Sequence, residues 1–283
     1  MLKSKEQSKF RVGPSFLQYM CKTALITGGS SGIGFEYARE FISRGYCAAL
    51  VSNRQDELAG AKESLEREFG QTVHTLCIDL TQNGSSRQIF DWCDSQGLEV
   101  EVLVNNAGMF FMEYLGPENL GKASAMLKLH INSVTEMCVL FGSRMKERGG
   151  GYILNMSSMT ARIPAPGIAV YSASKAYLKS FGKGFSYEVR PFGVKVTTVC
   201  PAAIDTGLYP LGEGLRKTLR RLGIIRSPRW LVRRAVRALY RGRRTVSPGI
   251  TNVIVPALVA ILPSRMVDRM GLKWINGQGQ GAG

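Results

Sequence analysis

Apolar residues in the first part of the chain gather in short runs that are separated by stretches long enough to form helices. Six of these runs are KTALITG from residue 22, CAALVSN from 47, VHTLCIDL from 73, VEVLVNNAG from 100, GYILNMSS from 151 and VKVTTVCP from 194. Strands that are apolar almost throughout, and not only at alternate positions, are typical of a parallel sheet covered by helices on both faces. The pattern therefore predicts a doubly wound α/β fold.

This fold also predicts where a ligand binds. Right-handed crossovers bring the carboxyl ends of parallel strands to one edge of the sheet, and a crevice opens there where the strand order reverses. RTVSPG from residue 244 is a candidate seventh strand. We therefore expect a sheet of about seven strands whose crevice lies along its carboxyl edge.

The last quarter of the chain has a different pattern. SPRWLVRRAVRALYRG begins with Ser227 as a helix cap and Pro228 at the first helical position. Its apolar stripe consists of Val232, Ala235, Val236 and Leu239, and its cationic ridge of Arg229, Arg233, Arg237 and Arg241. The apolar run ITNVIVPALVAILP follows and is broken by Pro256. We expect a C-terminal helical extension.

The charge of the chain is concentrated in the same region. The formal net charge is +16, of which residues 1–207 carry +3 and residues 208–283 carry +13. An apolar segment that is too short to span a bilayer, flanked by arginines, resembles an interfacial membrane anchor. A solvated basic helix followed by a core or dimer helix fits the same pattern equally well.

Composition limits the class of protein. The chain has 283 residues, of which 45% are apolar and 20% charged, as in a soluble globular protein with one large α/β domain. Its six cysteines are scattered without a CxxC pair or a metal-ligand cluster, so we expect reduced thiols and no metal site. The N-terminus has no recognisable signal peptide. We expect a cytoplasmic protein, with peripheral membrane contact as an open alternative.

Two short motifs carry candidate chemistry. TGGSSGIG, residues 27–34, follows the first predicted strand and precedes an amphipathic helix, so its glycines would let a pyrophosphate approach the helix N-terminus. In YSASK, Tyr171 and Lys175 lie one helical turn apart, and an ammonium beside a phenol favours the phenolate. Taken alone, this second pair is better explained by a chance spacing on an amphipathic helix, and it needs the support of other motifs.

Five motifs together resemble the short-chain dehydrogenase/reductase family. They are TGGSSGIG, NNAG at 105–108, Asn132 in HINSV, NMSS at 155–158 and YSASK, in the family's order and intervals over roughly residues 20–207. The resemblance implies a Rossmann-type domain that binds NAD(H) or NADP(H) and moves a hydride between the nicotinamide and a carbonyl or alcohol carbon. It also implies a homo-oligomer, either a dimer or a tetramer.

The resemblance assigns four catalytic roles. Ser158, thirteen residues before the tyrosine, would hydrogen-bond the substrate oxygen, and Tyr171 would exchange a proton with it. Lys175 would lower the pKa of the tyrosine and hold the nicotinamide ribose. Asn132 would orient a water that returns the proton through Lys175.

The second predicted strand bears on which cofactor binds. An NAD-selective site usually has an acidic residue there, whereas this chain has Asn53 followed by Arg54, which favours the 2′-phosphate of NADP(H) over NAD(H). Ala202 in CPAAIDTG stands where the family often has glycine. The full set of implied cofactor contacts is Gly28, Ser30, Ser31, Gly32, Ile33, Gly34, Asn53, Arg54, Asp79, Leu80, Asn106, Ala107, Gly108, Tyr171, Lys175, Pro201, Ile204 and Thr206.

We divide the chain into an N-terminal extension at 1–20, a catalytic domain at 21–249 with a substrate loop at 208–226, a helical segment at 250–275 and a flexible tail at 276–283. The ending is similar to that of family members acting on lipophilic substrates, namely long-chain 3-oxoacyl reductases and hydroxysteroid dehydrogenases. A basic rim would also attract an acyl thioester. The alternative is a regulatory Rossmann scaffold whose arginines bind nucleic acid or membrane.

Overall fold

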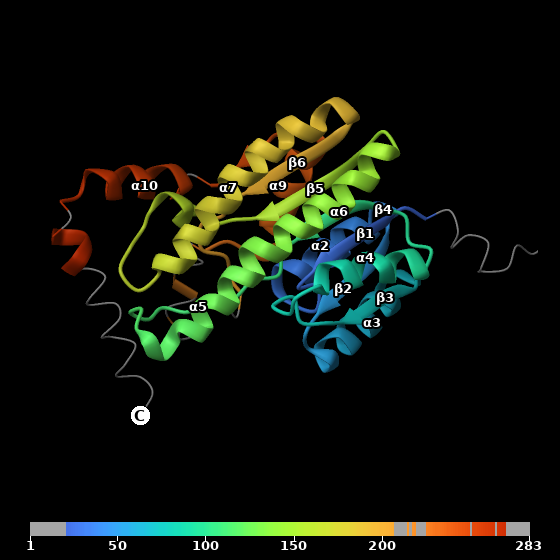
Figure 1. Cartoon of the computed structure of the whole chain (residues 1–283), viewed down its shortest axis with the longest axis horizontal. Coiled ribbons are helices and arrows are strands. Elements are labelled where there is room, and N and C mark those ends of the chain that lie inside the picture. Colours follow the sequence, from blue (N-terminus) through green and yellow to red (C-terminus); the bar gives the residue numbers. More distant parts are fainter. Residues whose placement is uncertain are drawn as a thin grey trace, which may run out of the picture.

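Buried apolar strands form one parallel sheet at the centre of the computed structural model, which describes residues 21–206, 214, 217–218, 225–249, 251–263 and 265–269 (Figure 1). The seven strands within these residues are β1 (Thr23–Thr27), β2 (Cys47–Ser52), β3 (Val73–Cys77), β4 (Val100–Asn105), β5 (Gly151–Met156), β6 (Val194–Val199) and β7 (Thr245–Val246). Their order is β3-β2-β1-β4-β5-β6-β7, and every pairing is parallel. The predicted doubly wound sheet is confirmed.

Helices cover both faces of the sheet because each face is apolar. One face packs against α2 (Gly32–Ile42), α3 (Gln55–Phe69) and α9 (Pro228–Tyr240). The other packs against α4 (Ser85–Ser95), α6 (Ser133–Glu147) and α7 (Ala169–Val189). Other described helices are α5 (Leu120–Leu127), α10 (Thr251–Ile261), the 3₁₀ turns Pro117–Asn119, Met159–Arg162 and Arg190–Phe192, and the π-helical turn Lys128–Asn132, and residues 265–269 are also helical.

The strand order reverses between β1 and β4. The chain moves outward from β1 to β2 and β3, then returns to pair β4 on the other side of β1. The segments that leave β1 and β4 at their carboxyl ends therefore diverge, and a crevice opens between them. The Gly-rich turn and NNAG are these two segments.

The C-terminal helix α9 agrees with its sequence pattern. Ser227 caps it by accepting a hydrogen bond from the backbone N–H of Trp230 at 3.3 Å. The predicted stripe of Val232, Ala235, Val236 and Leu239 is buried against the sheet and α2. In contrast, α10 lies at the end of the molecule beside the 3₁₀ turn Met159–Arg162, with Ile254 and Leu258 exposed (Figure 1). No helix among the described residues is long and apolar enough to cross a membrane.

The cysteines depart from the expectation of reduced thiols, because Cys21 and Cys47 form a disulfide. The parallel pairing of β1 with β2 aligns Thr23 with Cys47, which brings the two cysteine Cα atoms to 5.7 Å, a normal disulfide separation. The sequence hides this pairing because the two residues are 26 positions apart and the register between strands is not visible in it. The other four cysteines are free thiols.

Several predicted segments cannot be compared with the structure. The N-terminal extension at 1–20, most of the substrate loop at 208–226 and the tail at 276–283 lie outside the described residues.

Candidate active site

A cleft of about 860 Å³ runs along the carboxyl edge of the sheet, at the point where the strand order reverses. Its volume is in the range of cofactor and substrate sites. Apart from Gly34, every predicted cofactor contact lines it, together with Ser158. Ala202, which stands where the family often has glycine, also lines the cleft. Further lining residues, none of them among the predicted contacts, are Ser52, Glu57, Ile78, Thr81, Met109, Ala125, Leu129, Met156 and Ser157.

The turn after β1 is held by the strand beside it. Thr27 Oγ1 accepts hydrogen bonds from the backbone N–H groups of Asn106 and Ala107, each at 3.0 Å. The Asn106 amide in turn donates to the carbonyls of Thr27 and Gly28 at 3.0 and 3.2 Å. The side chain of Asn106 therefore joins the ends of β1 and β4. Thr27 is the first residue of the Gly-rich motif, and the structure adds its role as the acceptor of two backbone N–H groups.

Glycine is required in this turn for two different reasons. Gly28 has a φ of +63°, in the left-handed region that side chains disfavour. At Gly34, a Cβ would lie 1.9 Å from the carbonyl oxygen of Gly28. The turn therefore folds back tightly on the start of α2, whose first N–H groups border the cleft. This arrangement fits a pyrophosphate, since a helix N-terminus with close backbone approach is suited to an anion.

The rim at the end of β2 contains a carboxylate beside the expected arginine. Arg54, whose side chain is 70% exposed, forms an ion pair with Glu57 on α3. Ser30 Oγ lies 3.1 Å from both Glu57 Oε2 and Ser52 Oγ. The hydrogen bond from Arg54, with a further one from Ser30, lowers the pKa of Glu57, so this carboxylate is ionised at neutral pH. Glu57 thus links Arg54 to the Gly-rich turn.

Asp79 lies in the same part of the cleft, just after β3. Its carboxylate accepts hydrogen bonds from the backbone N–H and the hydroxyl of Thr81, both at 2.9 Å. The backbone hydrogen bond from Thr81 is the main reason why its pKa is lowered. Asp79 is therefore a fixed, ionised acceptor.

Ser158, Tyr171 and Lys175 meet at the other end of the cleft. Ser158 follows β5, where its Oγ accepts the N–H of Thr160 at 3.2 Å. Tyr171 and Lys175 are both buried on α7, with Lys175 Nζ 5.5 Å from the centre of the tyrosine ring. A hydroxyl that accepts a hydrogen bond keeps its own proton for donation, so Ser158 can still act as a donor to an acceptor in the cleft.

Lys175 is a buried amine. Its Nζ donates a hydrogen bond to the carbonyl of Met156 at 3.1 Å, and burial lowers its pKa to about 7. The backbone of the same residue is held by Ser157, whose hydroxyl donates to the Lys175 carbonyl at 2.7 Å. Ser157 therefore supports the helix, while Ser158 lines the same cleft as Tyr171 and Lys175.

The structure does not bring Asn132 to the cleft. It is the last residue of the π-helical turn Lys128–Asn132 and is exposed. The buried residue in this turn is His130, which contacts the ring of Tyr171. Residues two positions apart face roughly opposite sides of a helical turn, so Asn132 is exposed where His130 is buried. His130 begins the motif HINSV, but the motif drew attention only to its asparagine.

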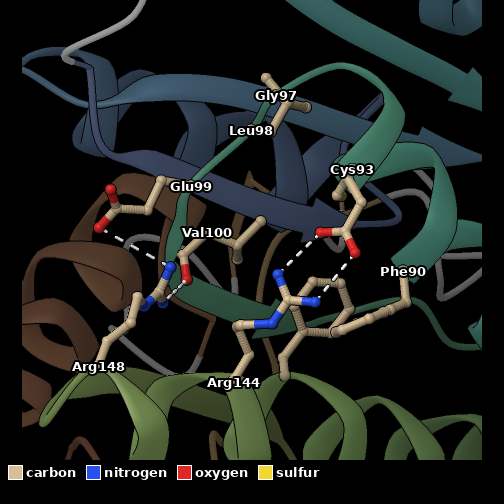
Figure 2. A pocket seen from close by; sticks show the side chains of 10 residues that line it. Phe90, Cys93, Gly97, Leu98, Glu99, Val100, Arg144 and Arg148 are labelled. Atoms are coloured by element: carbon tan, nitrogen blue, oxygen red, sulfur yellow. Dashed lines mark hydrogen bonds and ion pairs between the residues drawn. The ribbon is translucent and has the colours of Figure 1, made fainter.

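A second hollow of about 290 Å³ lies at the opposite edge, near the start of β4 (Figure 2). Figure 2 shows that its charged side chains pair with one another. Arg144 holds Asp94 through two hydrogen bonds of 3.0 Å, and Arg148 donates to the Val100 carbonyl at 2.6 Å. These groups join α4, α6 and β4, so we regard the hollow as a structural feature.

A family model described as short chain dehydrogenase matches residues 22–211. Very-long-chain 3-oxoacyl-CoA reductase-A of Danio rerio is 33% identical over 191 residues, which cover 65% of this chain and 59% of the relative. The 17-beta-hydroxysteroid dehydrogenase type 3 of Mus musculus is 35% identical over 197 residues, which cover 68% of this chain and 63% of the relative. The matched region thus spans roughly three fifths of these two relatives.

Solved structures have the same fold. The short-chain dehydrogenase from Sphingobium yanoikuyae in complex with NADPH superposes with a TM-score of 0.71 at 25% identity, covering 86% of this chain and 96% of that one. The L-sorbose reductase of Gluconobacter frateurii, complexed with NADPH and L-sorbose, gives a TM-score of 0.71 at 25% identity and covers 81% and 96%.

The close contact at Gly34 makes a testable prediction about the turn. Gly34→Ala should destabilise the fold by about 2–3 kcal/mol, because the new Cβ overlaps the Gly28 carbonyl and the turn must move. Gly60→Ala, in open space within α3, is the control and should stabilise by about 0.5–1 kcal/mol. Urea unfolding measures both, and equal effects would show that the turn is not tightly packed.

Proposed function

This chain belongs to the short-chain dehydrogenase/reductase family, and from that membership we propose an NADP(H)-dependent oxidoreductase that interconverts a carbonyl and a secondary alcohol on a lipophilic substrate. The observation that carries the proposal is the meeting of Ser158, Tyr171 and Lys175 in one cleft with a Gly-rich turn at the head of a helix. A dinucleotide would occupy the Gly-rich turn, and a carbonyl compound would contact Ser158 and Tyr171. Together the two ligands account for all of these groups.

The residues of the site fit a proton transfer to a carbonyl oxygen. Bound NADPH would supply the hydride to the substrate carbon. The Ser158 hydroxyl would donate a hydrogen bond to the substrate oxygen, and the Tyr171 phenol would deliver a proton to it as negative charge develops. Lys175, with its pKa lowered to about 7, exchanges protons near neutral pH and favours the phenolate when it is charged.

The opposite end of the cleft fits the adenosine half of the dinucleotide. The turn around Gly28 and the N-terminus of α2 would hold the pyrophosphate. Asp79 would accept from the adenine, and Arg54 would pair with the 2′-phosphate after leaving Glu57. The two related structures from Sphingobium yanoikuyae and Gluconobacter frateurii are complexes with NADPH, which supports NADP(H) over NAD(H).

The side chains near the tyrosine support a lipophilic substrate. Phe110 packs edge-on against the ring of Tyr171 at 4.9 Å, and Met109, Leu129 and Met156 line the cleft beside it. These side chains favour an apolar ketone over a sugar or a small acid. The two curated relatives are named for a very-long-chain 3-oxoacyl-CoA and for a hydroxysteroid, both of which are lipophilic. We therefore propose a ketosteroid or a 3-oxoacyl thioester as the substrate type.

The arginines of α9 suggest how such a substrate reaches the protein. Their side chains point away from the sheet, and seven of the eight between 226 and 244 are exposed, namely Arg226, Arg229, Arg233, Arg234, Arg237, Arg241 and Arg243. We call this group the arginine surface. The ring of Trp230 lies between two of its members, 5.3 Å from Arg226 and 4.3 Å from Arg234, so their positive charges are held close together.

Apolar side chains accompany the arginine surface. Trp230 also packs beside Gly249, just before α10, which connects α9 to the exposed Ile254 and Leu258. Arginines beside exposed apolar residues fit the surface of an anionic membrane, whereas nucleic acid needs only the charge. We therefore propose peripheral contact with anionic lipid.

The proposed role of the tyrosine is tested by Tyr171→Phe. Loss of the phenolic proton should reduce kcat for NADPH-dependent reduction by at least about 100-fold, while the fold and NADPH binding remain, because the ring keeps its packing. Tyr187→Phe, on an exposed part of the same helix, is the control and should leave kcat unchanged. A screen of ketosteroids, 3-oxoacyl thioesters and small ketones provides the assay. Near wild-type kcat in Tyr171→Phe would rule the assignment out.

Cofactor choice is tested by Arg54→Ala. The variant should bind NADPH about 10-fold or more weakly and NADH nearly as before, since only the 2′-phosphate loses a charge-assisted contact. Arg67→Ala, which removes another exposed arginine of α3, is the matched control. Fluorescence titration gives the dissociation constants, and equal losses for both dinucleotides would show that Arg54 does not select.

Membrane contact is tested by cosedimentation with vesicles of neutral or anionic lipid across a salt series. Basic residues near an anionic bilayer contribute roughly 1 kcal/mol each, so changing Arg229, Arg233, Arg237 and Arg241 to Gln should abolish binding at low salt. The control changes four exposed basic residues elsewhere: Lys62, Arg67, Arg87 and Lys122. Wild-type protein that binds a DNA duplex but leaves anionic vesicles unbound would contradict the proposal.

A further inference from the structure

His130 lies behind the reacting groups, in a position that the proposed chemistry does not use. Its side chain is buried, with 1% of its surface exposed. It belongs to the π-helical turn between α5 and α6, and its ring packs edge-on against that of Tyr171 with the centres 5.8 Å apart. A buried imidazole requires partners for both ring nitrogens.

Both nitrogens have partners, and these come from two different parts of the site. The backbone N–H of Met109, in the segment that follows β4, donates to His130 Nε2 at 3.1 Å. His130 Nδ1 lies 2.9 Å from the Oγ of Ser174 on α7. One imidazole thus connects the segment on the dinucleotide side of the cleft to the helix that carries Tyr171 and Lys175.

The direction of these hydrogen bonds fixes the state of the ring. Nε2 must be unprotonated, because it accepts from an amide N–H. Ser174 donates its own proton to the Tyr171 carbonyl at 2.8 Å, so its oxygen accepts from Nδ1–H. His130 is therefore neutral and protonated on Nδ1, and the chain of hydrogen bonds runs from Met109 through His130 and Ser174 to the backbone of Tyr171.

The surroundings preserve the neutral state. Two titratable side chains of α7, Lys175 and Tyr171, face the imidazole. Of the two, only Lys175 can carry a positive charge. Burial, followed by this charge, holds the pKa of His130 well below its usual range. Protonation of Nε2 would also break the hydrogen bond from Met109. The connection is thus present throughout the neutral pH range.

Gly108 shows how closely the segment approaches the ring. A Cβ at this position would lie 3.2 Å from His130 Nε2, closer than an ordinary contact. Glycine at 108 therefore lets the backbone reach the imidazole. The Gly108–Met109 segment is therefore held against the imidazole by a hydrogen bond and by close packing.

We propose that His130 is a positioning residue, which fixes the phenol of Tyr171 relative to the Gly108–Met109 segment by bridging the Met109 N–H and Ser174 Oγ. This inference rests on the proposed role of Tyr171. It assigns to His130 no contact with substrate or cofactor. The packing of its ring against Tyr171 and the hydrogen bond to the Tyr171 backbone through Ser174 would act together on one side chain.

The first test does not depend on activity. In ¹⁵N-labelled protein only His74 and His130 give imidazole signals, and His74→Gln assigns them. His130 should show the neutral Nδ1–H tautomer from pH 6 to 9 without titrating, and Ser174→Ala should change its nitrogen shifts. A charged imidazole, or the Nε2–H tautomer, would overturn the bridge whatever the enzyme's substrate.

The second test uses turnover. His130→Phe keeps a ring beside Tyr171 but removes both hydrogen bonds, and should lower kcat about 10- to 100-fold, with the dissociation constant of NADPH changed less than about threefold. Ser174→Ala should lower kcat in the same direction, and the double variant should be no worse than His130→Phe, since both act through one connection. Additive losses, or losses equal in kcat and NADPH affinity, would mean a merely structural role and overturn the proposal.

Two further outcomes distinguish a failure of the His130 proposal from a folding defect and from a failure of the proposed function. If His130→Phe does not fold, the decision rests on Ser174→Ala, a nearly isosteric change, and a wild-type kcat in that variant overturns positioning. If the wild-type protein turns over no carbonyl compound, the proposed function fails while the tautomer measurement still decides the bridge. The two ideas can therefore fail independently.

Discussion

The mutual hydrogen bonding of Thr27 and Asn106 is the interaction on which the rest of the site depends. The segments that follow β1 and β4 diverge. Without these hydrogen bonds, the carboxyl ends of the two strands could separate. Thr27 Oγ1 receives two backbone N–H groups from the β4 end, and the Asn106 amide returns two hydrogen bonds to the β1 end. With the two ends joined, the Gly-rich turn and NNAG form the two sides of one cleft. The glycines of the turn can then lie close to a bound ligand, because the backbone on either side of the cleft is held in place.

At the far end of the cleft, the corresponding constraint is the burial of a titratable amine, that of Lys175. Lys175 is buried with a backbone carbonyl as its acceptor, and desolvation keeps its pKa near 7. A carboxylate in the position of His130 would stabilise the ammonium and raise that pKa. The neutral imidazole instead provides two hydrogen bonds without adding charge. A histidine at position 130 thus joins the neighbouring segments by hydrogen bonds and adds no negative charge that would raise the pKa of Lys175.

How much the sequence could predict depended on whether the signal was local. The strands, α9 and the cleft residues were predictable because apolar runs, a helix cap and Gly-rich spacing are properties of consecutive residues. Glu57 and the Cys21–Cys47 disulfide were not, because each depends on the register of β1 with β2 or on the direction of a side chain in the fold. Thr27 belongs to the Gly-rich motif, but its hydrogen bonds depend on the pairing of β1 with β4. The π-helical turn was also invisible in the sequence, and in it His130 is buried and Asn132 is exposed.

The ion pair between Arg54 and Glu57 has a consequence for how the protein responds to its ionic environment. A phosphate that arrives at Arg54 must displace an internal carboxylate, so binding exchanges one ion pair for another. Dissolved salt weakens the pair that is broken as well as the pair that is formed. If Arg54 holds the 2′-phosphate as proposed, the affinity for a phosphorylated ribose would vary less with ionic strength than the affinity of a lone exposed arginine for the same group.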